Sequence, residues 1–129
     1  MVIKRSPGGS VYPYYYMGGE LFGIQLGGQG RNEEGAIQYL RAEFEFLKAQ
    51  HSRISFWMDF HQTKLTGKLI SEILRNVDSI EGQIGKLAIV GCSALDQWRL
   101  DRQLKRRPFP VKYYSDPENA KKWLVGKGK

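Results

Sequence analysis

The stretch Ile54-Ser-Phe-Trp-Met-Asp-Phe60, continued by His61-Gln-Thr-Lys-Leu-Thr-Gly67, decides the fold of this chain. Its first half is apolar on one face and nearly apolar on the other, which predicts a parallel strand covered by helices on both sides. Its second half is a polar turn in which Thr66 is a candidate N-cap for the next helix. In such sheets, ligands and partners meet the carboxyl ends of the strands. We therefore expect a functional site near residues 59–67.

The pattern of strand and helix continues towards the C-terminus. Residues 86–91 form a short apolar run bounded by glycine, which is typical of a central parallel strand. Ser93 has the spacing of a capping box and should begin a helix over about 93–107 that turns Leu95, Trp98 and Leu104 towards the core. Further helices are expected over about 33–50 and 67–80 and from Asp116-Pro117 onwards, with a last strand over 109–114.

The N-terminal part predicts two antiparallel strands. Residues 11–17 are rich in tyrosine, and Gly18-Gly19 favours a hairpin turn into a second strand over 21–26. Residues 1–10 have the composition of a flexible lead-in, and 126–129 of a basic tail. A chain of 129 residues is sufficient for one domain, expected over 11–125. The predicted fold class is α/β, a mixed sheet of about five strands (an N-terminal hairpin, then parallel βαβ units) with about four helices.

The net charge of +7 is concentrated in the last third of the chain. Residues 1–85 carry nine Lys/Arg and nine Asp/Glu, whereas residues 86–129 carry eleven Lys/Arg and four Asp/Glu. Arg99, Arg102 and Arg106 recur at helical spacing and should form an outward basic surface. Such a field attracts phosphates, acidic proteins or anionic membranes, and a merely solvated face is the alternative.

Composition also excludes several classes of protein. The one cysteine, Cys92, cannot form an internal disulfide, and no apolar run approaches the roughly 18 residues of a membrane span. The N-terminus lacks a secretory pattern, so a cytoplasmic location is expected. The glycines of residues 27–31 lack the third glycine of a dinucleotide loop. No cofactor or metal is expected.

Two motifs resemble a known family. Met58-Asp59-Phe60, a short loop and Thr66-Gly67 match one of them, and Tyr113-Tyr114-Ser115-Asp116 followed by Ala120 and Trp123-Leu124 matches the other. With the order of elements, they make residues 12–124 similar to the STAS family, named for sulfate transporters and anti-sigma factor antagonists, and in particular to its SpoIIAA-like subgroup. The resemblance implies a bacterial signalling domain in which a partner kinase phosphorylates Thr66. Plain helix capping is the alternative role of Thr66.

The leading functional hypothesis is a non-enzymatic regulatory or binding domain. It would dock a protein partner, such as a kinase or anti-sigma-type regulator, or a small anionic ligand, at the strand outlets. The residues expected there are Asp59, His61, Thr63, Lys64, Thr66, Cys92 and Ser93. The alternative is lipid or anionic-membrane binding through the basic C-terminal third.

Other functions are less well supported by the sequence. Nucleic-acid binding is disfavoured because basic and aromatic positions do not alternate on one face. Catalysis is disfavoured because His61 and Cys92 make a nucleophile and base only if geometry joins them. Pairing of two copies through the tyrosine-rich strand, which would form a homodimer, is a further alternative.

Overall fold

The computed structural model describes residues 4–5, 11–12, 14–16, 19–26, 33–49, 53–61 and 65–126, with backbone alone before Leu21 and at Gln25. The described strands are β1 (Lys4–Arg5), β2 (Val11–Tyr12), β3 (Tyr14–Tyr16), β4 (Gly19–Gln25), β5 (Ile54–Asp59), β6 (Ile84–Val90) and β7 (Val111–Tyr114). The described helices are α1 (Glu33–Lys48), α2 (Gly67–Ser79), α3 (Ala94–Leu104) and α4 (Pro117–Val125), with a 3-10 turn at Glu81–Gln83.

Four parallel strands carry the fold. The main sheet has the order β3-β4-β5-β6-β7, in which β4 to β7 are parallel and β3 runs antiparallel to β4. The predicted α/β class with four helices and parallel βαβ units is confirmed for the described part of the chain. Strands β1 and β2 pair in a separate ladder, so two residues of the expected lead-in form a strand.

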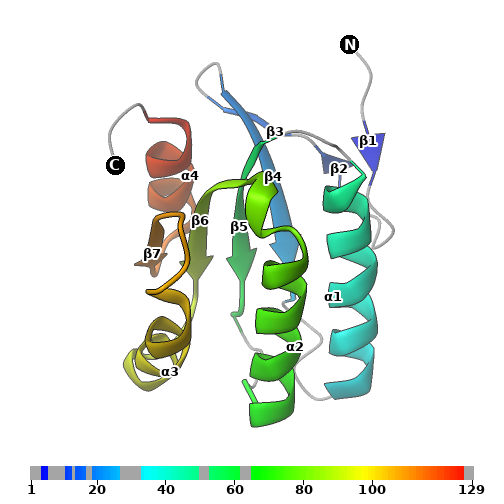
Figure 1. The fold of residues 1–129 in the computed structure, drawn as a ribbon. Coiled ribbons are helices and arrows are strands. Elements are labelled where there is room, and N and C mark those ends of the chain that lie inside the picture. Colours follow the sequence, from blue (N-terminus) through cyan, green and yellow to red (C-terminus); the bar gives the residue numbers. More distant parts are fainter. Residues whose placement is uncertain are drawn as a thin grey trace.

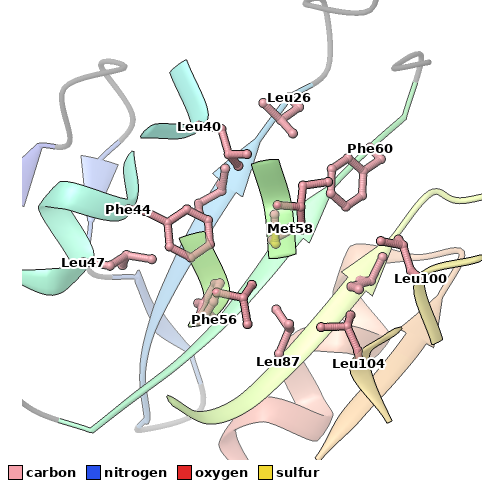
Figure 2. Packing of buried hydrophobic residues seen from close by; sticks show 14 of the residues in the cluster. Leu26, Leu40, Phe44, Leu47, Phe56, Met58, Phe60, Leu87, Leu100 and Leu104 are labelled. Atoms are coloured by element: carbon pink, nitrogen blue, oxygen red, sulfur yellow. The ribbon is translucent and has the colours of Figure 1, made fainter. Parts of the chain in front are cut away.

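Helices cover both faces of the main sheet, as the apolar β5 predicts. On one face, α1, α2 and α3 pack over a core that contains Phe44, Phe56 and Leu87 (Figure 2). On the other face, α4 packs with Ala120 and Leu124 on Trp57 of β5 and its neighbours. The parallel strands β4 to β7 run in one direction, and α1 and α2 begin near the carboxyl ends of these strands, at the lower end of the view (Figure 1).

Helix α3 departs from the prediction. Leu95 and Trp98 were expected inward, but 64% and 56% of their surface is exposed. Leu104 is buried as expected, and Leu100 is buried with it, in the same core as Leu87 (Figure 2). The prediction was wrong because α3 covers the end of the sheet beside β7, where only one side of the helix finds a surface to pack against.

Some predictions lie outside the described residues. They include Gly18 of the expected Gly18-Gly19 turn, the glycine loop at 27–31 and most of the basic tail, whereas Gly19 is the first residue of β4. None of the helices that are described is long and apolar enough to cross a membrane.

Candidate functional site

The carboxyl ends of β5, β6 and β7 form one rim held by backbone hydrogen bonds. Phe60 N donates to Val90 O over 2.8 Å, and Gly91 N donates to Tyr114 O over 3.0 Å. Asp59 lies opposite Val90 in the ladder between β5 and β6. The structure therefore gathers several of the predicted site residues at one edge of the sheet.

Asp59 and His61 shape the turn after β5. Asp59 Oδ1 accepts a hydrogen bond from His61 N over 2.9 Å and lies 2.7 Å from His61 Nδ1. His61 packs over Gly91, which has φ +85°, and a Cβ on Gly91 would come within 2.8 Å of the imidazole. Glycine is therefore required at position 91 both by its backbone conformation and by this contact.

Thr66 joins the starts of two helices. Its Oγ1 accepts a hydrogen bond from Leu69 N over 3.1 Å, which caps α2 as predicted, and donates one to the Glu33 carboxylate at the start of α1. Lys68 adds an ion pair with Glu34 over 3.2 Å. Sequence reasoning missed Glu33 as the partner of Thr66. Thr63 and Lys64, the other two residues expected here, lie outside the described residues.

Cys92 and Ser93 follow β6, and both have structural roles. Burial raises the pKa of the Cys92 thiol to about 12, and the charges of Asp96 and Asp59 add to the shift. The thiol therefore stays protonated at neutral pH and is a poor nucleophile. Ser93 Oγ accepts a hydrogen bond from Asp96 N over 3.2 Å and caps α3 as predicted.

The three arginines of the predicted basic surface have different surroundings in the structure. Arg99 Nη1 donates to Leu65 O over 2.9 Å and to Asp96 Oδ1 over 3.0 Å, so it ties α3 to the loop before α2. The prediction that Arg99 points outward was therefore wrong, because these acceptors hold its guanidinium against the protein. Arg102 lies over the Trp98 ring, 4.8 Å from its centroid, and Arg106 is exposed.

A groove of about 590 Å³ lies between α3 and β7, and we call it the α3–β7 groove. It is lined by Ala94, Gln97, Trp98 and Asp101 of α3 and by Val111, Lys112, Tyr113 and Tyr114 of β7. Tyr113 Oη donates to Asp101 Oδ1 over 3.3 Å. Burial and the nearby Asp101 charge raise the Tyr113 pKa, so the phenol remains a neutral donor. The groove thus combines aromatic walls with fixed polar groups, as ligand and partner sites do.

Sequence reasoning missed this groove, although a signal was present. At about 100° per residue, Leu95 and Trp98 lie on the same side of the helix as Arg102. Leu100 and Leu104 lie on the opposite side. Two apolar patches on opposite sides of one helix indicate that only one of them faces the core. We call Leu95, Trp98 and Arg102, together with the exposed Arg106 in the turn after the helix, the exposed α3 face.

Comparison with known proteins identifies the fold. No family model matches the chain, and no curated protein matches it. A solved structure of an uncharacterised protein from the DUF3478 family, with a SpoIIAA-like fold, from Shewanella loihica PV-4, matches with a TM-score of 0.56. The sequences are 17% identical, and the match covers 95% of this chain and 90% of that one. The chain therefore has a SpoIIAA-like fold, as its sequence motifs led us to expect.

Proposed function

We propose that this chain is a non-enzymatic binding domain that docks a protein partner at the strand-outlet rim, through the exposed α3 face and the adjoining α3–β7 groove. The observation that carries the proposal is the exposure of Leu95 and Trp98, at 64% and 56%. Large apolar side chains that gather on a surface mark interaction sites. Trp and Arg are enriched among the residues that dominate binding energy, and here Arg102 stacks on Trp98.

The chemistry of the rim supports binding over catalysis. The Cys92 thiol is held in its protonated form, and the Ser93 hydroxyl caps a helix. His61 pairs with Asp59 and packs over Gly91. Each of these candidate reactive groups therefore has a structural role that accounts for its position.

Regulation by phosphorylation of Thr66 has weaker support. The hydroxyl of Thr66 already donates to the Glu33 carboxylate. A phosphate there would place like charges next to one another and would disrupt the junction of α1 and α2. Docking at the exposed α3 face does not depend on such a switch.

Site-specific photo-crosslinking in the cells that express the chain tests the proposal. A photoreactive amino acid replaces Leu95 in one variant and the exposed Gln38 of α1 in the matched control. We expect a discrete protein adduct from position 95 but not from 38, and its loss on Trp98→Ala. Trp98 is largely exposed, so that substitution should change the free energy of unfolding by less than about 0.5 kcal/mol. Absence of an adduct, or the same adduct from both positions, would overturn the proposal.

A second candidate is binding to an anionic membrane surface. It is favoured by the mixture of Leu95 and Trp98 with Arg102 and Arg106 on the exposed α3 face, since interfacial helices combine apolar and basic residues in this way. Co-sedimentation with vesicles of phosphatidylserine and phosphatidylcholine tests it. The candidate predicts sedimentation that falls with salt, with Arg106→Glu and with removal of phosphatidylserine. Sedimentation indifferent to all three would exclude it.

A further inference from the structure

β7 is the edge strand of the main sheet, and its outer side borders the α3–β7 groove. It pairs with β6, and the sheet has no further strand beyond it among the described residues. Leu87 N donates to Pro110 O over 3.1 Å, and Gly91 N donates to Tyr114 O over 3.0 Å. Successive residues of a strand turn their backbone groups to opposite sides. The N–H and C=O groups of Val111 and Tyr113 therefore point away from β6, towards the space beside the sheet.

The two faces of β7 differ in chemistry. The Val111 and Tyr113 side chains pack with the core under α3 and line the α3–β7 groove. Lys112 lies on the opposite face, with its Nζ 5.4 Å from the centroid of the Trp123 ring. On one face, alternate side chains of a strand added beside β7 would meet the aromatic rings of Trp98 and Tyr113, with the polar groups of Gln97 and Asp101 nearby. Its other side chains would meet a basic group.

The charge around this edge is strongly positive. Residues 94–114 contain six Lys/Arg and two Asp. Arg99 is paired with Asp96, and Arg107 is paired with Asp78 from α2. The other four basic residues of this segment are Arg102, Lys105, Arg106 and Lys112, and its second acid is Asp101. The edge is therefore complementary to an acidic segment.

We propose that the occupant of the α3–β7 groove is an acidic, extended peptide segment of the partner protein that adds to β7 as a further strand. Its backbone pairs with Val111 and Tyr113, its apolar side chains contact Trp98, and its acidic side chains face Lys112. This inference rests on the proposed docking function. Strand addition of this kind obtains affinity from main-chain hydrogen bonds and specificity from alternate side chains.

Other occupants fit the edge less well. A phosphate backbone or a lipid headgroup offers no row of N–H donors to the C=O groups of Val111 and Tyr113. A second copy of the chain, paired through β7, would bring two Lys112 side chains together and oppose two chains of net charge +7. An acidic peptide supplies both the backbone groups and the charge.

The test uses the full chain and a fluorescein-labelled peptide of alternating glutamate and valine, with binding followed by fluorescence anisotropy. Two further peptides carry N-methyl groups, one on every valine and the other on every glutamate. In an added strand, one alternating set of N–H groups faces β7 and the other faces solvent. We expect one methylated peptide to lose about tenfold or more in affinity and the other to bind like the parent. Loss with methylated valines indicates an antiparallel strand, and loss with methylated glutamates a parallel one.

A pair of protein variants provides an independent readout. Val111→Pro removes an N–H that points away from β6, so the ladder with β6 stays intact, while Val111→Ala trims the same side chain and keeps the donor. We expect Val111→Pro to bind the parent peptide about tenfold more weakly than Val111→Ala does. Circular dichroism confirms that both are folded. If Val111→Pro unfolds, the methylated peptides decide the question.

Three results would overturn the inference. The first is that the parent peptide does not bind. The second is that both methylated peptides bind as tightly as the parent, and the third is that both lose the same factor in affinity. Vesicle binding without peptide binding would favour the membrane candidate instead. If position 95 crosslinks to a partner but one of these three results is found, only the strand addition is rejected and the docking function stands. If crosslinking also fails, the docking function itself is rejected.

Discussion

Gly23 of β4 lies beneath one of the largest side chains of the core. It is opposite Trp57 of β5 in the parallel ladder, and a Cβ at this position would come within 2.2 Å of the Trp57 ring. Trp57 is buried, with 1% of its surface exposed, and has no room to withdraw. Only the absence of a side chain at Gly23 allows the indole to lie across the sheet.

Gly23→Ala should therefore destabilise the fold by overpacking, by about 1–3 kcal/mol. The matched control is Gly82→Ala, because nothing lies within 4 Å of a Cβ at Gly82 and its backbone suits alanine. That substitution should be neutral or should stabilise by about 0.4–1 kcal/mol. Urea unfolding of both variants gives the comparison. Equal stabilities would contradict the assigned contact between Gly23 and Trp57.

Among the elements, the junction of α1 and α2 depends on the two hydrogen bonds of Thr66. Thr66→Ala should cost about 0.5–2 kcal/mol through loss of the cap. Thr66→Glu should cost more, since it places a second carboxylate beside Glu33. Adding Glu33→Gln should recover part of that difference. Thermal and urea unfolding measure these effects.

Ser93→Ala is a control for the loss of a cap alone. Ser93 caps α3 with the same geometry, since its Oγ accepts a hydrogen bond from Asp96 N of its own helix. Its cost should resemble that of Thr66→Ala. If Thr66→Glu were as stable as Thr66→Ala with Glu33 in place, the repulsion would be absent, and a phosphate on Thr66 would be easier to accommodate than we infer.

Local signals predicted the elements well because they act within one turn or one strand. The apolar β5 and β6 are confirmed as central parallel strands, and Thr66, Ser93 and Asp116 are confirmed as helix caps. Each of these signals depends on neighbours a few residues apart. The chain could therefore be divided into its helices and strands without knowledge of their packing.

Contacts between distant residues could not be predicted in the same way. Glu33 meets Thr66 across 33 positions, and Arg99 meets Leu65 across 34. The exposure of Trp98 depends on where the sheet ends, which no local pattern states. Sequence reasoning thus found the rim of the strands but not the groove beside β7, which is lined by the exposed Trp98.

For the molecule as a whole, a buried carboxylate takes part in an ionic contact between two of the helices that cover the sheet. Glu72 of α2 is buried, with 5% of its surface exposed, and accepts hydrogen bonds from Arg41 of α1 over 2.6 and 3.2 Å. Arg75 lies 2.9 Å from the same carboxylate. The hydrogen bond from Arg41 is the main cause that lowers the pKa of Glu72 below its ordinary value of 4.5, and it outweighs the opposing effect of burial.

This shift makes the stability of the whole fold depend on pH. The folded protein holds the Glu72 proton more weakly than the unfolded chain does, so the stabilisation is complete above the unfolded pKa near 4.5. It is lost as pH falls through the lower folded pKa. Glu72→Gln removes the ionisable group and should therefore unfold more easily than wild type at neutral pH, while the difference shrinks as pH drops below 4.5.

The measurement is the free energy of unfolding in urea for both proteins across this range, with Glu45→Gln, on the exposed side of α1, as a control for the loss of one carboxylate. A difference between wild type and Glu72→Gln that stayed constant with pH would mean that the Arg41 contact adds no net stability. The two helices would then be held over the sheet mainly by their apolar faces. If the difference in unfolding free energy becomes smaller at acidic pH, the ionised Glu72 carboxylate contributes to the packing of α1 and α2 over the sheet.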